Sequence, residues 1–379
     1  MKKTNGFGLF GVILIMIITA LISSIATGVI MLNSSVEINN NGLLIEDKYL
    51  NDFIKVYETI VNKYYDEIDK KGMLDAAESG MLNFLGDKYT TFLENEEYNE
   101  ILNELSATYN GIGILIENNK IVEVTKDSPA EKAGIQNNDI ILKINNIDTT
   151  NLIASEIGEI IKKDKEPVNM LINRNGVELN FYVEKADLIN VAIDYSKLEN
   201  TNIGYLKIKK FSDNLDIQVS EALKELENIG IKSLIIDVRN NVGGYLSAAE
   251  NTSSLFLKSG KTIYSLQTST TTIKYKDETK ENRDYNIVVL INNNSASAAE
   301  ILAAALKESY GATLVGTKTY GKGKVQQIVG ESAKYTFAKW LTPNGICIDG
   351  IGISPDYYVS NITEDTIDYQ LNKAIELLS

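Results

Sequence analysis

Residues 287–300 read I-V-V-L-I-N-N-N-S-A-S-A-A-E, and this stretch decides the fold class. Its first five residues are apolar and mostly β-branched, which predicts a buried strand. A helical pattern follows from about Ser297 to Tyr310, and the polar residues between the two form a loop. A buried strand that leads directly into a helix is typical of an α/β protein.

The alternation of strand and helix continues on both sides of this stretch. Apolar runs predict further strands at residues 203–208, 234–238 and 312–315, and an amphipathic helix at 215–229. Short alternating strands fill residues 109–183, and a helical pattern covers residues 47–105. The sequence therefore predicts a helical N-terminal region, a small β-rich part and an α/β core.

The composition of the 379-residue chain excludes several classes of function. Lys and Arg number 37 against 51 Asp and Glu, and the net charge of −14 disfavours a nucleic-acid partner. The chain has no histidine, and Cys347 is its only cysteine, which excludes an imidazole base, histidine-bound metals, disulfides and Cys–His nucleophiles. Proton transfer must therefore use Lys, Asp, Glu, Tyr or water, and no cofactor or metal is expected.

Ser297 stands at the predicted start of a helix, where two interpretations compete. A serine hydroxyl there lies at the positive end of the helix dipole, beside unpaired N–H groups that suit an oxyanion. However, Ser297 and Glu300 also match the S-x-x-E capping box, which has no catalytic meaning. Ser295 is a weaker candidate nucleophile. Catalysis requires a general base near the serine, whereas capping does not. Because the chain has no histidine, we expect this base to be a desolvated lysine.

Lys322 is the candidate base, because it lies between Gly321 and Gly323 in front of a predicted strand. A solvated surface lysine is the alternative. A phosphate-binding loop is a second alternative, since residues 316–322 spell G-x-x-x-x-G-K. That motif fails at Gly323, where it requires Ser or Thr, and the following segment is predicted to be a strand rather than a helix.

Two glycine-containing turns complete the set of candidate segments. Gly243 and Gly244 follow a buried strand and can direct a backbone N–H at an oxyanion. In the β-rich part, the G-I-G-I sequence at residues 111–114 precedes a strand, and residues 128–134 predict a short helix with Pro at its first turn and Gly after its end. Successive backbone N–H groups at such a turn can bind a peptide carboxylate, while an exposed strand edge accepts the peptide.

The N-terminus carries an uncharged stretch at residues 7–32, behind Lys2 and Lys3. A helix of this length spans about 39 Å, more than the hydrocarbon core of about 30 Å. The stretch predicts a membrane anchor, and the two lysines predict a cytoplasmic N-terminus with the rest of the chain outside. A cleaved signal peptide is the alternative, because residues 23–26 (S-S-I-A) resemble a cleavage site.

In order and spacing, these segments resemble the C-terminal processing peptidases, also called tail-specific proteases, over nearly everything after residue 50. Ser297 and Lys322 are 25 residues apart and Lys322 and Gln326 are 4 apart, as in the family pattern, and the tail from Thr342 to Asp356 also fits. Residues 93–185 resemble an inserted PDZ domain. Three positions depart from the pattern without touching the candidate Ser–Lys pair: Val242, where the family usually has Pro, Ala299, where Ser is common, and Ile346, where Arg is frequent.

The resemblance implies a fold and a role for each candidate residue. The fold would be an α/β protease core of the crotonase- and ClpP-like ββα type with an inserted PDZ domain, a helical N-terminal region and one N-terminal transmembrane helix. Ser297 would be the nucleophile, Lys322 the general base and Gln326 the residue that orients the lysine. The oxyanion donors would be the backbone N–H groups of Ala298 and of Gly243 or Gly244. The peptide C-terminus would bind at Gly111, Ile112, Gly113 and Ile114, with the two isoleucines lining its apolar pocket.

The expected domains follow from the same resemblance. They are residues 1–32 as the cytoplasmic stub and anchor or signal peptide, 33–92 as the helical N-terminal region, 93–185 as the PDZ domain and 186–379 as the Ser-Lys protease core.

The implied function is a serine endopeptidase held in the cell membrane by a single span, with its catalytic part outside the cytoplasm. Its partners would be a protein or peptide substrate with a free C-terminus, the membrane and, as often in the family, a second copy of the chain. Two other interpretations stay open. One is a non-catalytic, membrane-tethered PDZ scaffold in which Ser297 only caps a helix. The other is a hydrolase with paired carboxylates, for which no Asp or Glu pair stands out.

Overall fold

The computed structural model describes residues 38–39, 42–43, 47–163, 167–280, 282–360 and 367–379. The chain divides into two compact units, residues 1–77 and 78–379. The expected membrane anchor at residues 7–32 lies outside the described residues. Among the helices that are described, none is long and apolar enough to cross a membrane.

The described residues of the first unit form two short paired strands and helices. Its elements are β1 (Ile38–Asn39), β2 (Gly42–Leu43), α2 (Lys48–Lys63) and the first half of α3 (Lys70–Phe84), which ends in the second unit. Asp47 caps α2, because its side chain accepts hydrogen bonds from the N–H groups of Tyr49 and Leu50. The apolar face of the amphipathic helix α2 is exposed. Its members are each 40% or more accessible: Leu50, Phe53, Val56 and Ile60. A face of this kind buries little apolar area by itself, so α2 gains little stability from packing.

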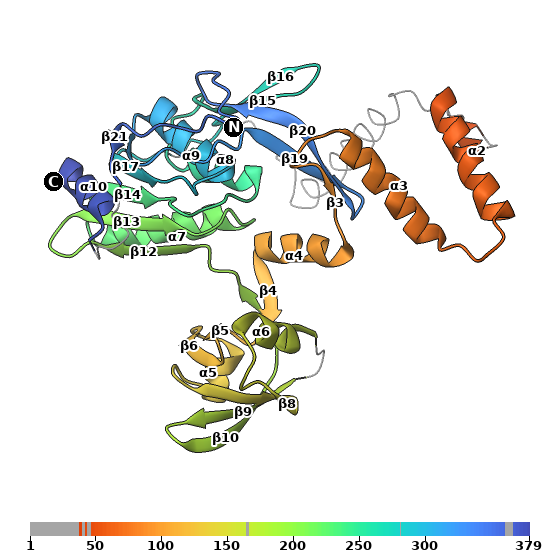
Figure 1. The fold of residues 1–379 in the computed structure, drawn as a ribbon. Helices are drawn as coiled ribbons and strands as arrows, with labels where there is room; N and C mark the ends of the chain where they lie inside the picture. The colour runs from red at the N-terminus through yellow and green to blue at the C-terminus, as the bar shows by residue number, and fades with distance from the viewer. Residues whose placement is uncertain (1–37, 40–41, 44–46, 164–166, 281, 361–366) are drawn as a thin grey trace, which may run out of the picture. The chain divides into compact units, whose positions relative to one another are not determined.

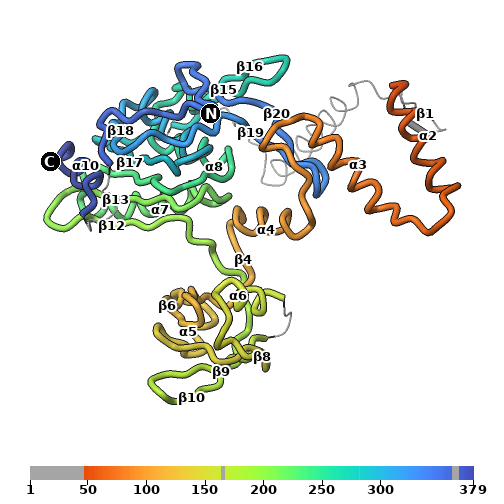
Figure 2. The backbone as a smooth tube through the Cα atoms, viewed as in Figure 1, coloured from red at the N-terminus to blue at the C-terminus, as the bar shows by residue number. Residues whose placement is uncertain are grey.

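The second unit begins with the end of α3, and three short elements then lead to the β-rich part. After α3 come β3 (Thr91–Phe92), α4 (Asn95–Leu105) and β4 (Thr108–Gly111). A reciprocal pair of hydrogen bonds between Glu94 and Glu97 forms a capping box at the start of α4. Figure 2 follows the chain from α4 through β4 into the β-rich part. The predicted helical pattern of residues 47–105 is confirmed in α2, α3 and α4, with a loop and β3 between the last two.

The β-rich part is a six-stranded sheet in the order β10-β9-β7-β6-β5, with β8 paired to β7. Its elements are β5 (Ile114–Glu117), β6 (Lys120–Val124), α5 (Pro129–Ala133), β7 (Ile140–Ile144), β8 (Ile147–Asp148), α6 (Ala154–Lys163), β9 (Val168–Arg174) and β10 (Val177–Val183). Val168, Met170 and Ile172 alternate into a core shared with α6. The predicted short helix is α5, which Ser128 caps and which ends at Gly134 with φ 91°. β4 pairs with β11 (Ala186–Ile189), so the entering and leaving segments of the chain are held together.

The α/β core is built on a six-stranded sheet in the order β12-β13-β14-β17-β18-β21, parallel except for β12. Its elements are β12 (Ile193–Lys197), β13 (Ile203–Ile208), α7 (Leu215–Asn228), β14 (Ser233–Asp237), α8 (Leu246–Ser254), β17 (Asn286–Ile291), α9 (Ala298–Ala305), the π-helical turn η1 (Leu306–Tyr310), β18 (Thr313–Gly316), β21 (Tyr357–Tyr358) and α10 (Tyr369–Leu378). The predicted strands and helices of the core are confirmed to within two residues at most ends, except that α9 gives way to η1 after Ala305.

The two faces of this sheet have separate cores. Leu234 and Ile236 of β14 point into the cluster formed with α7, α8 and α9, whereas Ile235 between them packs with Ala374 of α10. This period-two alternation explains why the central strands are apolar throughout, since both faces are covered. Figure 1 shows α10 on the opposite side of the sheet from α8 and α9.

A second sheet, ordered β16-β15-β20-β19, lies beside this core, and β3 pairs with β20. Its strands are β15 (Thr262–Gln267), β16 (Thr272–Lys276), β19 (Lys324–Val329) and β20 (Ala333–Leu341). β15 contacts both α8 and α9. Because β19 begins two residues after Lys322, this sheet fixes the segment that carries the candidate base.

Candidate active site

Ser297 lies between β17 and α9 in a strained backbone conformation. Its φ is 57° and its ψ −119°, which is rare for a residue with a side chain. The residue is half-buried at the first turn of α9. Backbone strain of this kind is found where surrounding structure holds a residue in place for function. The hydroxyl therefore stands at a fixed helix N-terminus, as the sequence predicted.

One buried carboxylate binds both candidate catalytic segments. Glu300 Oε2 accepts hydrogen bonds from the backbone N–H of Ser297 and from that of Lys322, each at 2.9 Å. Its Oε1 accepts from the Thr319 hydroxyl at 2.5 Å and from the Gly321 N–H at 2.8 Å. Burial raises the pKa of Glu300, and these four hydrogen bonds oppose that rise. The backbones of Ser297 and Lys322 are thus tied to the same oxygen atom.

The environment of Lys322 suits a general base. Burial lowers the pKa of its ammonium, the charge of Lys334 lowers it further, and Glu300 opposes both effects. The Lys322 carbonyl accepts a hydrogen bond from Trp340 Nε1 at 2.9 Å, which anchors the backbone. Within the described part of the chain, Lys322 Nζ has no hydrogen-bond acceptor. A lysine that loses its proton readily and donates no hydrogen bond can accept a proton from a serine hydroxyl.

Gly243 lies against Ser297, and no larger residue fits there. A Cβ atom placed on Gly243 would be 2.8 Å from Ser297 Cβ and 3.0 Å from the Ala298 nitrogen, at a φ of 105°. On Gly244, whose φ is 149°, it would be 2.3 Å from the Phe211 carbonyl oxygen. The Gly243–Gly244 turn is therefore beside the start of α9, as the oxyanion prediction requires. In this structure the Gly243 N–H donates to Asn241 Oδ1 at 2.8 Å, whereas those of Gly244 and Ala298 have no acceptor among the described residues.

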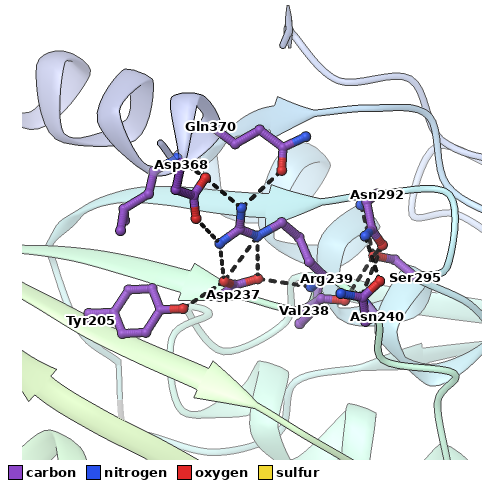
Figure 3. A network of polar contacts seen from close by, with 10 residues as sticks. Tyr205, Asp237, Val238, Arg239, Asn240, Asn292, Ser295, Asp368 and Gln370 are labelled. Atoms are coloured by element: carbon purple, nitrogen blue, oxygen red, sulfur yellow. Dashed lines mark hydrogen bonds and ion pairs between the residues drawn. The ribbon is translucent and has the colours of Figure 1, made fainter. Parts of the chain in front are cut away.

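Ser295, the weaker candidate nucleophile, is completely buried, and its hydroxyl connects two loops by hydrogen bonds. Its hydroxyl donates to the Val238 carbonyl at 2.8 Å and accepts from the Asn292 N–H at 3.0 Å. Asn292 and Asn240 exchange two further hydrogen bonds across the same two loops. Figure 3 shows these contacts joining the loop after β14 to the loop after β17. The nucleophile loop and the glycine loop are consequently held as one unit.

Arg239 joins the same glycine loop to the C-terminal helix. Its guanidinium donates to Asp237, at the end of β14, and to both carboxylate oxygens of Asp368, the N-cap of α10. Gln370 accepts a further hydrogen bond from it, and Tyr205 donates to Asp237 at 2.7 Å. These partners surround the side chain of Arg239 in Figure 3. Bidentate, largely buried ion pairs of this type fix backbone position better than exposed pairs do.

The predicted carboxylate-binding residues of the β-rich part form a tight turn between β4 and β5. Gly113 has a φ of 83°, and a Cβ there would be 2.3 Å from Ser128 Cβ, so only glycine fits. Ile112 is 2% accessible and packs in the core of this part, while its carbonyl accepts from the Ala130 N–H. Ile114 is half-buried at the start of β5. Of the two isoleucines predicted to line the pocket, Ile114 therefore offers more of its side chain to a ligand.

Comparison with known proteins shows the family of this chain. The chain is 36% identical to the carboxy-terminal processing protease CtpA of Bacillus subtilis (strain 168), over 90% of this chain and 75% of that protein. The family model for Peptidase family S41 matches residues 202–359. The chain belongs to peptidase family S41. Models of the PDZ domain and of the N-terminal domain of the activating protease CtpB match residues 120–174 and 24–97.

A second curated relative and one solved structure are also similar to this chain. Carboxy-terminal processing protease CtpB of Bacillus subtilis (strain 168) is 35% identical over 82% of this chain and 67% of that protein. A solved structure of a photosystem II D1 C-terminal processing protease has a TM-score of 0.51 at 24% identity, covering 88% of this chain and 92% of that one, and shows the same fold. The chain is thus a serine-type C-terminal processing protease with a PDZ domain, which acts on peptides or proteins.

Gln326, which the family resemblance predicts to orient Lys322, has a different hydrogen-bond partner in the structure. Its amide nitrogen donates to the Thr336 hydroxyl at 3.2 Å, and no hydrogen bond from Gln326 to Lys322 Nζ is present in the described residues. Thr336 in turn donates to Asp87, which also binds Lys324 Nζ at 2.7 Å and the Thr90 hydroxyl at 2.9 Å. The orienting role of Gln326 stays a prediction. The sequence does not predict the Asp87 network, because Lys324 and Thr336 lie more than 230 residues away from Asp87.

Asp87→Asn is expected to lower the free energy of unfolding at pH 7 by about 1 to 2 kcal/mol. Burial alone would raise the pKa of Asp87, but hydrogen bonds from Lys324, Thr336 and Thr90 outweigh it and lower the pKa from 3.8 to about 2. Because the folded-state value is the lower one, the contribution is present above pH 3.8 and is lost as the pH falls towards 2. Urea unfolding at a series of pH values measures it.

The exposed Asp127 provides the control for this experiment, since Asn is also compatible with its φ of 60°. Asp127→Asn should leave the stability nearly unchanged at every pH. A difference between wild type and Asp87→Asn that stays constant down to pH 2 would contradict the expected linkage.

Proposed function

We propose that this S41 protease is anchored in the cell membrane, acts outside the cytoplasm and cleaves by a Ser–Lys dyad, with Ser297 as nucleophile and Lys322 as general base. The observation that carries the proposal is the Glu300 carboxylate, which accepts hydrogen bonds from the backbone of both residues. A link of this kind has no purpose for a serine that only caps a helix. It favours the protease over the non-catalytic scaffold.

The reaction follows from the chemistry of the two side chains. Neutral Lys322 Nζ takes the proton of the Ser297 hydroxyl while Oγ attacks the scissile carbonyl carbon. The N–H groups of Ala298 and of Gly243 or Gly244 bind the oxyanion; Gly243 would first have to give up its bond to Asn241. Lys322 then gives its proton to the leaving amine, and water hydrolyses the acyl-enzyme. Gln326, whose side-chain oxygen has no hydrogen-bond donor among the described residues, would orient the lysine.

The PDZ domain would select substrates by their free C-terminus. The backbone N–H groups of the turn at Gly111, Ile112, Gly113 and Ile114 would bind the terminal carboxylate, and β5 would accept the peptide as an added strand. Ile114 would contact an apolar terminal side chain. The proposed division of the chain stays at residues 1–32, 33–92, 93–185 and 186–379.

Membrane anchoring rests on the uncharged stretch at residues 7–32. The proposal predicts that the full chain stays with the membrane fraction after washing at alkaline pH, and that external protease digests the catalytic part in intact cells. Release of a shortened soluble form would support the cleaved signal peptide instead.

A homodimer is proposed as the working form. The exposed apolar face of α2, which includes Leu50, Phe53, Val56 and Ile60, supports this, because a second copy would cover it. Sedimentation of the purified chain tests the proposal: Phe53→Glu should yield monomers, and a wild-type chain that is monomeric at micromolar concentration would contradict it.

The dyad is tested by identifying cleavage products. Fluorescently labelled casein, an unfolded protein, is incubated with the wild type or with Ser297→Ala and analysed by mass spectrometry. Wild type should yield defined peptides and Ser297→Ala none, although its thermal unfolding should match. Equal cleavage by both would refute Ser297 as nucleophile, and no cleavage by either would favour the scaffold.

A further inference from the structure

The ring of Tyr89 lies over the amine of Lys322. The distance from Lys322 Nζ to the centroid of the ring is 5.4 Å, and two other lysines approach the same ring: Lys88 at 4.7 Å and Lys324 at 5.8 Å. Tyr89 is half-buried and belongs to the loop between α3 and β3. No sequence motif pointed to this residue, which is 233 positions before Lys322 in the chain.

The loop that carries Tyr89 is fixed on both sides. On one side, Asp87 binds Lys324 Nζ and the Thr336 hydroxyl. On the other, the buried Thr90 accepts a hydrogen bond from the Thr336 N–H at 3.1 Å. β3 then pairs with β20 through Thr91 and Phe92, and the Leu93 N–H donates to the Ser332 carbonyl at 2.7 Å. Tyr89 is consequently held in place by the same strand, β20, that supports the base segment.

The other charged groups around Lys322 do not explain how water is kept away from it. Glu300 lies beneath its backbone, and Lys334 on β20 repels its charge. Lys324 forms an ion pair with Asp87 and is also attracted by the charge of Asp349, while Lys88 is exposed. All of these act through charge. Among the described residues around the Lys322 amine, Tyr89 is the one that places an aromatic surface over it.

We propose that Tyr89 is a positioning residue for the dyad: its ring covers the Lys322 amine, excludes water from it and restricts where the nitrogen can lie. The inference rests on the proposed role of Lys322 as general base. The Tyr89 ring has no part in bond making or breaking, so its effect is on the protonation and placement of the lysine alone.

Two effects of the ring oppose each other, and their sizes differ. The negative face of an aromatic ring attracts an ammonium, and this attraction would raise the pKa of Lys322. Loss of water disfavours the ammonium, and burial is the largest of the effects that lower the pKa of Lys322. Since exclusion of water is the larger effect, removal of the ring should raise the pKa of Lys322.

The experiment compares four variants of the full chain in detergent with labelled casein, using the pH dependence of kcat/KM, which reports the free enzyme. Tyr89→Ala should move the midpoint of the acidic limb up by about one pH unit and lower kcat/KM at neutral pH by about tenfold. Tyr89→Phe and Tyr89→Leu, which keep an apolar cover, should stay within about 0.3 unit of wild type. Lys88→Ala is the control, because Lys88 contacts the same ring from solvent; it should stay equally close.

Several outcomes would overturn the inference. They are an unchanged midpoint in Tyr89→Ala, a shift in Tyr89→Phe as large as that in Tyr89→Ala, or a similar shift in Lys88→Ala. If Tyr89→Ala does not fold, as judged by circular dichroism, Tyr89→Gln replaces it, since its polar amide should stabilise the ammonium and move the midpoint in the same direction.

Failure of this inference is distinguishable from failure of the dyad. If Lys322→Ala is inactive and the Tyr89 variants have the wild-type midpoint, only the role of Tyr89 is wrong. If Lys322→Ala keeps its activity, the dyad is wrong and the role of Tyr89 falls with it.

Discussion

Lys322→Ala is expected to lower kcat at least about a thousandfold, about as much as Ser297→Ala. Without the amine, no group in the described site can take the proton of the serine hydroxyl, because the nearby carboxylate of Glu300 is already bound by four donors. Since the two residues act as one unit, the double variant should be no worse than either single variant. Steady-state kinetics with labelled casein, over a range of enzyme concentrations, measures all three.

The control for this result is Lys318→Ala, an exposed lysine in the same segment. It should keep nearly full activity. The wild-type rate should rise with pH, because burial lowers the pKa of Lys322 and only the neutral amine accepts a proton, and the midpoint should lie below 10.5. Multiplicative losses in the double variant, or a rate governed by a group that titrates near pH 4, would contradict the dyad.

The sequence was sufficient for those parts of the site that depend on local order. The strand before Ser297 and the helix after it follow from apolar periodicity, and the choice of Lys322 follows from the resemblance to the family, whose spacing the two residues match. The Gly243–Gly244 turn could also be predicted, because glycine pairs after a buried strand mark a close approach of the backbone. The structure adds the reason: there is no room for a Cβ beside Ser297.

The parts that could not be predicted are contacts between distant segments. Tyr89 and Asp87 reach the base segment only because β3 pairs with β20, and the two strands are more than 230 residues apart. Arg239 reaches Asp368 across the sheet edge for a similar reason. The sequence around a tyrosine or an aspartate in a loop contains no local pattern that predicts such a contact. Only the three-dimensional structure shows its partner.

From sequence, the capping box and catalysis are alternative interpretations of Ser297. In the structure, both interpretations involve Glu300. Glu300 accepts from the Ser297 N–H, as a capping box requires. The same carboxylate also accepts from Thr319, Gly321 and Lys322, which a cap does not need. The local motif was therefore correct but incomplete, since its second half lies 19 to 22 residues further along the chain.

Glu300→Gln is expected to lower the plateau value of kcat about a hundredfold and the free energy of unfolding by about 3 kcal/mol. Each carboxylate oxygen accepts two hydrogen bonds, so an amide must turn its own N–H₂ donors towards two of the four donors. Ser297 and Lys322 then lose their shared anchor. Kinetics across the pH range, together with urea unfolding, measures both effects.

The pH profile of this variant separates positioning from charge. Because Glu300 raises the pKa of Lys322, a neutral glutamine should lower that pKa and move the acidic limb of the profile down. If Glu300 acted only through its charge, the variant would be as active as wild type or more active at neutral pH. If it positions the two backbones, kcat stays low at every pH although the base is more easily deprotonated. Glu331→Gln, at an exposed turn, is the matched control, and a Glu300→Gln plateau equal to that of Glu331→Gln would rule out the anchoring role.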